Sequence, residues 1–554
     1  MMTHIKNNFI NKIIKHAILK NPNCKIRTRF PPEPNGYLHI GHAKSIYLNF
    51  NIATKYNGIC HLRFDDTNPK KEHVKYINAI KKDIKWLGFD CYKNPKYTSN
   101  YFPQLYQYAI QLIQNNLAYV DELNTQEIKN YRGSLTKKGT NSPFRNRSIK
   151  ENLILFEKMK NGMFAQGAMC LRAKINMKSP YIILRDPVLY RIIYSEHHQT
   201  KNEWCIYPMY DFAHCIVDAL EKITHSLCTL EFMDNRQLYI WILKKLNFIQ
   251  KPPKQYEFSK LNLEYTILSK RKIQKLIDCK LVDGWGDPRL HTISGLRNKG
   301  YTKNSIKMFC QKIGVTKQQN MIELSLLESC IRKDLNMTSP RRMAVINPIK
   351  IIITNIDKDH LEYLDAPNHP NIKEMGTRKI IFSNEIYIER EDFYEHVIKN
   401  YKGLVLGEKV RLKYAYTIQA NKILKNANNE ISCILCTLDL YKEKKLQQPI
   451  KKYNIIHWIS TKNSIKAQFQ LFDVLFKSKD IDQEKDIIEA YNPNSCIIKI
   501  GYVESITDHE HVKHAYQFER IGYFLKINKN NQCNTIFNRI VSLKNKYKTF
   551  IKSN

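Results

Sequence analysis

The sequence predicts a protein of the α/β plus all-β class, with a parallel sheet in its first half and antiparallel sheets in its second. Up to about residue 262, short runs of β-forming residues alternate with helical stretches, which is the α/β pattern. After Pro340, apolar residues instead recur with period two. A chain of 554 residues is too long for one core, so we expect roughly three to five domains.

The first predicted element is an amphipathic helix. Phe9, Ile10, Ile13, Ile14 and Ala17 follow helical spacing and are interrupted by lysines, which indicates such a helix rather than a signal peptide. The sequence has no run of about 18 apolar residues, so we expect no membrane span.

A strand end, a stiff turn and a helix start come next. The extended run 27–30 leads into PPEP at 31–34, whose prolines cannot donate to a β-ladder and so end the strand. Asn-Gly at 35–36 supplies a permissive turn. Apolar residues then recur at helical spacing over 43–50, and Gly58 is the expected stop.

His39 and His42 lie three residues apart in the first turn of this predicted helix. A helix N-terminus offers unpaired N–H groups and a positive dipole end to phosphates. Two imidazoles beside it can donate hydrogen bonds to phosphate oxygens, and Gly41 lets a ligand approach the backbone. Two ordinary surface histidines are the simpler alternative, but the Pro/Gly frame favours a nucleotide site.

The second predicted strand, 58–66, ends in Asp65 and Asp66, at the edge where open parallel sheets bind ligands. A helix is expected over 74–87. We interpret residues 101–207 as an insertion that interrupts the sheet. Its expected parts are helices near 104–118 and 151–161, a basic loop at 132–147 and strand-like runs within 170–194. The parallel sheet is expected to resume near 206–212 and to continue through 226–231 to about 261.

Helical signals dominate from about residue 263 to 335, for example at 305–313 and 321–335. Beyond them, β runs are predicted over 350–356, 410–418, 455–459 and 497–500. The period-two alternation of Val410, Leu412, Tyr414, Tyr416 and Ile418 is typical of an antiparallel sheet, and we expect barrels.

The chain is strongly basic, with 89 Lys+Arg against 51 Asp+Glu and a formal net charge of +38. This excess favours a polyanionic partner, nucleic acid before membrane, although A/T-rich codons for Lys account for part of it. The 14 cysteines form no disulfide-like framework, which fits a reducing cytosol. The C-x-x-C at 433–436 lies in an apolar run without a second ligand pair, so we predict buried thiols rather than zinc.

Two motifs carry a family resemblance. Residues 39–42 read HIGH, letter for letter the signature of class I aminoacyl-tRNA synthetases, and the string at 31–42 closely resembles their glutaminyl subgroup. Residues 267–271, ILSKR, resemble the second signature, KMSKS, with Leu268 in place of the usual methionine. The resemblance covers residues from about 24 to about 547.

The resemblance implies a Rossmann-type catalytic domain in two halves (1–100 and 208–262), an inserted acceptor-end domain (101–207), a helical domain (263–337) and two anticodon-binding β-barrels (338–554). It implies glutamine–tRNA ligase activity, in which ATP with Mg²⁺ activates glutamine and the terminal 2′-OH of tRNA(Gln) accepts it, forming AMP and diphosphate. No structural metal is expected, and the enzyme would be a cytoplasmic monomer.

The implied catalytic residues are His39, His42 and Lys270, whose ammonium on a mobile loop can neutralise the leaving diphosphate. The implied ATP contacts are Glu33, Pro34, Asn35, His39, Gly41, His42, Ala43, Lys44, Ser45, Thr229, Lys260, Leu261, Leu268, Ser269 and Lys270.

For the amino acid, the resemblance points to Asp65 as the anion for the α-ammonium and to Tyr210 as a contact of both the ammonium and the side-chain amide. His214 and Gln255 would complete the pocket, Gln255 by holding a water or Tyr210. Glutamate is the alternative substrate, and its buried carboxylate would need cations. Cys228 is neutral where glutamate enzymes tend to carry arginine, although Arg29 remains nearby.

For tRNA, residues 132–136 resemble the acceptor-end hairpin of glutaminyl enzymes, in which Leu135 would wedge open the first base pair. Pro180 and Asp234 resemble readers of the acceptor stem, whose minor groove is open in RNA. The implied contacts near the anticodon are Lys317, Arg341, Gln517 and Arg520.

Three positions depart from the family pattern at the anticodon. Gly403 and Lys413 stand where arginine is expected, and Asn400 where glutamine is expected. Lysine keeps the charge but lacks the planar fork of arginine, so we expect looser discrimination of the anticodon.

Three other functions stay open from the sequence: a glutamyl-tRNA synthetase, a non-tRNA nucleotidyltransferase with a HIGH-like loop, and an RNA-binding protein with an inactive catalytic domain. The β pattern after residue 340 contradicts the all-helical anticodon module of common bacterial glutamyl enzymes. Nucleotidyltransferases are usually much shorter and do not need the C-terminal half. The intact His39, His42, Asp65 and Lys270 argue against an inactive domain.

Overall fold

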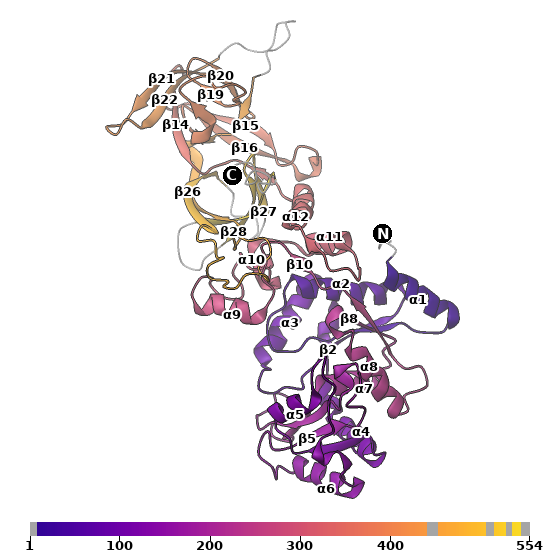
Figure 1. Ribbon diagram of the computed structural model, residues 1–554. Helices are drawn as coiled ribbons and strands as arrows, with labels where there is room; N and C mark the ends of the chain where they lie inside the picture. Colours follow the sequence, from indigo (N-terminus) through magenta and orange to yellow (C-terminus); the bar gives the residue numbers. More distant parts are fainter. Residues whose placement is uncertain (1–7, 440–452, 506–514, 528–534, 545–554) are drawn as a thin grey trace. The chain divides into compact units, whose positions relative to one another are not determined.

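The computed structural model describes residues 8–439, 453–505, 515–527 and 535–544 (Figure 1). The chain forms two compact units. The first consists of Met1–Leu263, Thr292–Ser294 and Cys310–Ile322. The second consists of Glu264–His291, Gly295–Phe309 and Glu323–Asn554.

The first unit opens with α1 (Phe9–Lys20), the predicted amphipathic helix, whose Ile10 and Ile14 are fully buried. A parallel three-stranded sheet with two helices follows. In chain order its elements are β1 (Arg27–Phe30), α2 (Ile40–Lys55), β2 (Ile59–Phe64), α3 (Val74–Leu87) and β3 (Lys96–Tyr97). The predicted strand–turn–helix order around the HIGH segment is confirmed.

A second parallel pair belongs to the same unit. Its elements are α7 (Tyr210–Leu220), β8 (His225–Thr229), α8 (Asn235–Lys245) and β9 (Lys254–Phe258). Thr224, just before β8, donates its backbone N–H to the carbonyl of Arg27, so the starts of β1 and β8 lie side by side. The two nevertheless form separate sheets, one of three strands in the order β1-β2-β3 and one of two strands, β8-β9.

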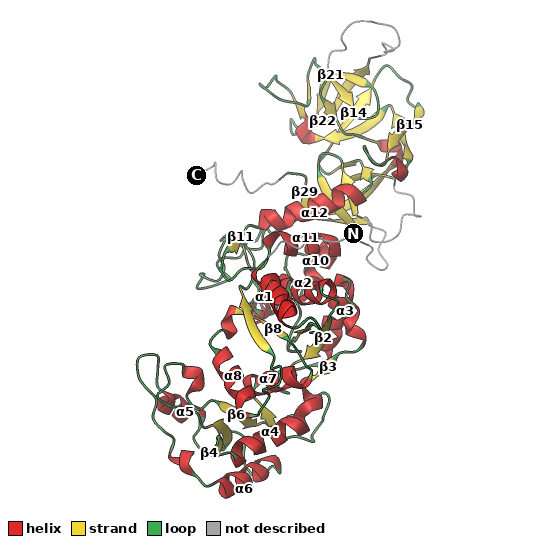
Figure 2. Cartoon of the chain, turned by 90° about the vertical axis from the view of Figure 1, so that its right-hand side faces the viewer, coloured by secondary structure: helices red, strands yellow, loops and turns green. Residues whose placement is uncertain are grey.

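Residues between these sheets form an antiparallel four-stranded sheet with helices against it (Figure 2). Its elements are α4 (Phe102–Gln114), β4 (Ala118–Asp121), α5 (Thr125–Arg132), α6 (Ile149–Lys160), β5 (Cys170–Ala173), β6 (Val188–Ile192) and β7 (Ile206–Pro208). The prediction that residues 206–212 resume the parallel sheet is wrong, because β7 pairs antiparallel with β6 and Tyr210 already begins α7. A three-residue strand carries too little pattern to reveal its partner.

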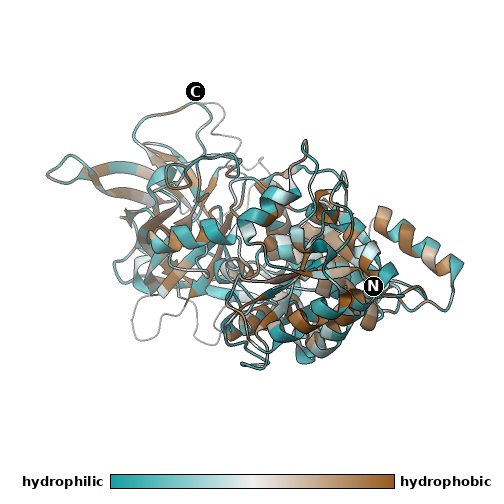
Figure 3. Ribbon diagram, turned by 60° about the horizontal axis from the view of Figure 1, so that its bottom comes forward, coloured by the Kyte–Doolittle hydropathy of each residue, from teal (hydrophilic) through white to brown (hydrophobic). Residues whose placement is uncertain are grey.

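A short parallel pair, β10 (Asn262–Leu263) with β11 (Met321–Ile322), also lies in the first unit. The helix predicted from residue 321 therefore begins later, at Leu324, because Met321 and Ile322 are extended. The remaining helices are α9 (Lys270–Asp278), α10 (Ile293–Lys299), α11 (Lys303–Ile313) and α12 (Leu324–Thr338). Apolar and polar residues alternate along the helices (Figure 3), and no helix among the described residues is long and apolar enough to cross a membrane.

Two seven-stranded sheets dominate the second unit. One has the order β23-β20-β21-β22-β14-β17-β24 and the other β12-β27-β28-β29-β25-β26-β13. In the second sheet the edge strands β12 (Arg341–Arg342) and β13 (Ala344–Val345) are separated by one residue, so the sheet curls until its edges meet.

The strands of the first sheet are β14 (Pro348–Ile353), β17 (Glu385–Glu389), β20 (Lys409–Leu412), β21 (Thr417–Lys425), β22 (Ile431–Leu438), β23 (Ile455–Ile456) and β24 (Ile459–Ser460). The others of the second sheet are β25 (Ser464–Phe472), β26 (Cys496–Glu504), β27 (Ala515–Phe518), β28 (Gly522–Ile527) and β29 (Thr535–Ser542). Two short pairs accompany them, β15 (Leu361–Pro367) with β16 (Thr377–Ser383), and β18 (Phe393–Tyr394) with β19 (Leu404–Val405).

Two sequence expectations fail here. The sheets are mixed rather than antiparallel, since β14 runs parallel to β22 and β25 parallel to β29. The alternation over 410–418 is not one strand but the hairpin of β20 and β21, with Val410 opposite Ile418 and Tyr414 at φ +61° in the turn. The period-two pattern of apolar residues continues through the turn because Tyr414 and Tyr416, which are not strand residues, are partly buried against the hydrophobic core.

Candidate active site

His39 and His42 cap the start of α2 reciprocally. The Nδ1 of His39 accepts from the backbone N–H of Gly41 at 3.1 Å, and the Nδ1 of His42 accepts from that of His39 at 3.1 Å. The ring centroids are 3.8 Å apart. Because both Nδ1 atoms act as acceptors, each neutral ring carries its proton on Nε2. The first turn therefore presents two Nε2–H donors next to the backbone donors of a helix N-terminus.

The turn before α2 is fixed from three sides. The carbonyl of Pro32 accepts from the N–H of Asp65 at 3.2 Å, and that of Pro34 accepts from His73 at 3.1 Å. The carbonyl of Leu38 accepts from Ile293 at 2.9 Å. The turn and the end of β2 are thus held together.

The implied ATP residues divide between the units. Thr229, at the end of β8, Lys260 and Leu261 lie in the first unit with the HIGH turn, and the Lys260 ammonium is 3.5 Å from Glu231. Leu268, Ser269 and Lys270 lie in the second unit. Convergence of the two signature loops on one nucleotide therefore stays a prediction.

Two lysines of these signatures have unusual positions. Lys44 is buried, donates to the Ser259 carbonyl at 2.6 Å, and has its pKa lowered to about 8 by burial, so its ammonium serves the fold. Lys270 is the first residue of α9, whose first turn contains no acid. A cation there opposes the helix dipole, which indicates a role other than helix stability.

Asp65 presents an unused carboxylate oxygen. Its Oδ1 accepts from Arg63 Nε and from Thr98 Oγ1, both at 2.9 Å. Its Oδ2 is buried and has no hydrogen-bond partner among the described residues. Burial raises the pKa of this carboxyl. A cationic group that donates hydrogen bonds, such as an α-ammonium, would satisfy both the charge and the open acceptor.

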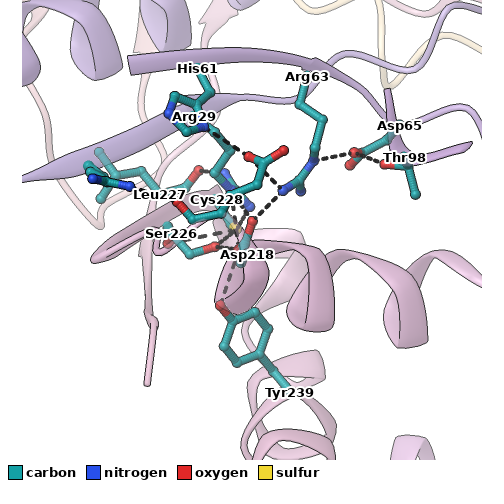
Figure 4. A network of polar contacts seen from close by, with 12 residues as sticks. Arg29, His61, Arg63, Asp65, Thr98, Asp218, Ser226, Leu227, Cys228 and Tyr239 are labelled. Atoms are coloured by element: carbon teal, nitrogen blue, oxygen red, sulfur yellow. Dashed lines mark hydrogen bonds and ion pairs between the residues drawn. The ribbon is translucent and has the colours of Figure 1, made fainter. Parts of the chain in front are cut away.

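Arg29 is fully buried, and each of its three guanidinium nitrogens donates a hydrogen bond (Figure 4). Its Nε donates to Asp218 at 3.2 Å, its Nη1 to the carbonyl of Leu227 at 3.0 Å and its Nη2 to Cys228 Sγ at 3.5 Å. Asp218 also accepts from Arg63 Nη1 at 2.8 Å. Burial alone would raise the pKa of Asp218, but Arg29 and Arg63 hold it below its usual range. The cation closest to Cys228 is thus already neutralised.

The buried network contains two cations and three carboxylates. The cations are Arg29 and Arg63, and the carboxylates are Asp65, Asp218 and Glu221, so the formal sum is −1 when His61, 3.0 Å from Glu221, is counted as neutral. The half-exposed Lys96 approaches Glu221 only to 3.9 Å, and water screens such a charge. One added ammonium brings the buried sum to zero, whereas an added carboxylate would restore the excess of negative charge.

The other pocket residues are uncharged. The Tyr210 ring stacks on His214 with centroids 4.4 Å apart, and burial lowers the pKa of His214 to about 3. Burial also raises the pKa of the Cys228 thiol. Gln255 donates from Nε2 to the Phe232 carbonyl at 2.8 Å and to Glu257 at 3.1 Å, and its expected role of holding a water or Tyr210 stays a prediction.

Besides Asp65 Oδ2, three more polar atoms of the network and pocket are buried without a hydrogen-bond partner in the described part of the chain: Arg63 Nη2, His214 Nδ1 and Gln255 Oε1. Such atoms are costly to leave unpaired, so they favour a polar ligand.

A neighbouring cluster was not predicted from the sequence. Asp66 Oδ2 accepts from Ser99 Oγ at 2.7 Å and lies 2.9 Å from His198 Nε2. Asp66, His197 and His198 bring potential metal-ligand atoms within 4.8 Å of one another. The Nδ1 of His197 accepts from two backbone N–H groups, however, and its Nε2 lies 3.0 Å from the Asp66 carbonyl oxygen. These bonds give His197 a structural role in holding the end of β2.

Leu135 lies on an exposed loop that a buried arginine organises. The Leu135 side chain is 84% exposed. Arg185, almost completely buried, donates to the carbonyls of Arg132, Ser134 and Lys137 at 2.8–3.0 Å and to that of Ser179 at 2.8 Å. Arg185 thereby ties the loop of Leu135 to the segment of Pro180. Asp234 is exposed at the start of α8.

Of the anticodon residues predicted in the β half, Arg341 and Gln517 lie on neighbouring strands, and Arg520 lies in the turn between β27 and β28. Arg341 of β12 is opposite Gln517 of β27, while Lys317 lies in the first unit. Arg520 donates from Nη2 to Asp392 at 2.7 Å.

The departures from the family pattern have structural correlates. Lys413 forms a salt bridge with Glu519. A Cβ at Gly403 would collide with the Tyr401 hydroxyl and the Asp392 carbonyl, so no side chain fits there as the chain is folded. Asn400 has φ +66°, a left-handed conformation that asparagine tolerates.

Comparison with known proteins covers almost the whole chain. Residues 25–337 match the family described as tRNA synthetases class I (E and Q), catalytic domain, and residues 339–439 and 455–526 match its anti-codon binding domains. The chain is 58% identical over 552 residues to the glutamine–tRNA ligase of Buchnera aphidicola subsp. Schizaphis graminum, covering 98% of each chain. It is 55% identical to that of Proteus mirabilis, covering 97% of each, and 53% identical to that of Haemophilus influenzae, covering 97% and 96%.

Proposed function

This chain belongs to the class I tRNA synthetases of the E and Q type, and we propose that it is a glutamine–tRNA ligase. The observation that carries the proposal is the buried network around Asp65. An open carboxylate oxygen there stands beside a pocket in which Arg29, the arginine next to Cys228, is neutralised by Asp218. The first feature suits an α-ammonium and the second an uncharged amide.

Activation of glutamine takes place at the start of α2. The Nε2–H groups of His39 and His42 and the backbone donors of the helix bind ATP phosphates, and the charge on these oxygens grows in the transition state. The glutamine carboxylate attacks the α-phosphorus in line, and diphosphate leaves with the Mg²⁺ that entered with ATP. Lys270 neutralises the departing charge. The enzyme positions and neutralises, without a covalent intermediate.

Selection against glutamate follows from charge. A second carboxylate would enter a buried network that already carries one excess negative charge, and both of its arginines are already ion-paired with carboxylates of the network. An amide has donors and acceptors for polar atoms such as Gln255 Oε1.

Transfer to tRNA uses the remaining segments. Leu135 separates the first base pair while Pro180 and Asp234 contact the acceptor stem, so the terminal adenosine can reach the adenylate through its 2′-OH. The two β-barrels bind the anticodon through Arg341, Gln517 and Arg520. The proposed arrangement is a Rossmann-type domain in two halves with an acceptor-end insertion, a helical domain and two barrels.

The test is ATP-dependent aminoacylation of tRNA(Gln) transcript with labelled glutamine and, separately, labelled glutamate. Esterification of glutamine in preference to glutamate is expected. Preference for glutamate, or failure to charge glutamine, would refute the proposal. Diphosphate exchange with and without tRNA then separates activation from transfer.

A further inference from the structure

A second cavity lies in the first unit, between α8 and β9. It has a volume of about 520 Å³, within the range of small-molecule sites. Its walls are largely apolar and include Leu243, Phe248 and Pro253. Two further wall residues, Ile240 and Ile249, are 52% and 68% exposed. Apolar side chains gathered around a hollow at the surface favour an apolar ligand.

The charge around this cavity has one sign. Three of its twelve lining residues are cationic and, among the described residues that form it, none is acidic. Arg236 is engaged with Glu257, to which its Nε donates at 2.9 Å. Lys244 and Lys254 are exposed and form no salt bridge with any described residue. The cavity therefore combines an apolar wall with two unmatched ammonium groups.

We propose that this cavity is a binding site for an amphipathic aromatic carboxylate, with the rings against Ile240 and Ile249 and the carboxylate at Lys244 and Lys254. The site adjoins the glutamine pocket and shares Gln255 with it, but Asp65, Tyr210 and Cys228 do not line the cavity. Tyr239 and Gln255 line the cavity, and Tyr239 also donates to Asp218 at 3.1 Å. The inference does not depend on the proposed ligase activity, because binding is measured without tRNA or ATP.

Charge complementarity selects this occupant over the others. A second copy of this chain, with net charge +38, would bring more cations to a cationic rim. A neutral apolar ligand would leave the two lysines unmatched. A carboxylate on a flat apolar body satisfies both features at once.

The test uses 2-naphthoate and its uncharged analogue 2-naphthamide with the full chain, followed by ligand-observed NMR and calorimetry. For a ligand of this size we expect 2-naphthoate to bind with Kd on the order of 1 mM or tighter. Binding of 2-naphthamide should be at least about tenfold weaker. Saturating glutamine should not displace 2-naphthoate.

Variants locate the site. Ile240→Asp and Lys254→Glu should each weaken 2-naphthoate binding about tenfold or more. Matched controls in the same unit, Ile154→Asp at a side chain 44% exposed and Lys129→Glu on α5, should leave it unchanged. The proposal is overturned if 2-naphthoate does not bind, if the amide binds equally well, if glutamine displaces it, or if the controls lose binding to the same extent.

Discussion

Replacement of Cys228 by arginine is expected to shift amino-acid preference toward glutamate. Cys228 is 7% exposed, and its Sγ lies 3.5 Å from Arg29 Nη2. Once the substrate ammonium is bound, the buried charges sum to zero by the count above, so a new guanidinium at this position would lack an anion of its own. The substrate carboxylate of glutamate could supply that anion.

The size of the shift follows from the charges. Two unit charges about 4 Å apart attract by roughly 4 kcal/mol at an effective dielectric constant near 20. Desolvation of both groups removes a large part, which leaves about 1–3 kcal/mol. The ratio of kcat/KM for glutamate to that for glutamine should therefore rise roughly 10–100-fold in Cys228→Arg. Overpacking should also lower glutamine activity, by about 1–3 kcal/mol of transition-state stabilisation.

The assay is steady-state aminoacylation of tRNA(Gln) with each amino acid. Cys228→Gln is the matched control, because it adds similar length without charge, and its glutamate to glutamine ratio should stay that of the parent. An unchanged or lowered ratio in Cys228→Arg would contradict the role assigned to Cys228 and to the neutralised arginine beside it.

Further predictions concern the ammonium site, the acceptor loop, buried histidines and the anticodon. Asp65→Asn should lower kcat/KM for glutamine about 100-fold or more, since an ammonium loses its buried anion; equal activity in this near-isosteric variant would remove Asp65 from the site. Leu135→Ala should lower kcat/KM for tRNA about tenfold, and a transcript with an unpaired first position should restore it; without restoration, Leu135 is no wedge. His214 and His291 have pKa values lowered to about 3 by burial, so the unfolded state binds more protons below pH 6.5. The stability that these histidines contribute is complete above pH 6.5 and falls by up to about 1.4 kcal/mol per histidine per pH unit toward pH 3. Thermal midpoints at pH 7 and 5 check this, and a higher midpoint at pH 5 would contradict it. Single anticodon substitutions should reduce aminoacylation less in this protein than in a relative with arginine at the positions of Gly403 and Lys413, and Lys413→Arg should make that reduction larger. An equally steep loss of aminoacylation in this protein would refute the prediction.

Local pattern was enough to predict the nucleotide-binding turn. Prolines, an Asn-Gly pair and helical spacing specify a strand end, a turn and a helix start within residues 27–50, and these are the elements observed. The type and order of these elements follow from residues near one another in sequence, although distant residues such as Ile293 then hold the turn in place. The reciprocal capping by His39 and His42 belongs to the same class, because an i, i+3 pair at a helix start can satisfy two backbone donors.

Pairing over long sequence distances was not predictable. Arg29 and Asp218 are 189 residues apart, and nothing in either local sequence indicates that the arginine is neutralised. In the sequence, Arg29 is a cation near the pocket and therefore argues against glutamine as the substrate. In the folded chain, Asp218 neutralises Arg29, and the pocket suits an uncharged amide. The partner of β7 and the mixed character of the C-terminal sheets are equally non-local, since a strand's own residues do not specify its neighbour.

The loop of Leu135 depends on the buried Arg185 as well as on its exposed leucine. An apolar side chain as exposed as Leu135 can compensate unstacking of a base pair only if it is already in place, because ordering a flexible loop on binding would cost free energy. Arg185 meets that condition by binding three carbonyls of the loop from below. A charged residue with a nearly inaccessible side chain is expensive to bury, so its retention under an exposed leucine indicates that the loop must be rigid before tRNA arrives. Arg185→Lys keeps the charge but has one nitrogen where Arg185 uses Nη1 for the three loop carbonyls and Nε for Ser179, so it should weaken tRNA charging as Leu135→Ala does while leaving glutamine binding unchanged.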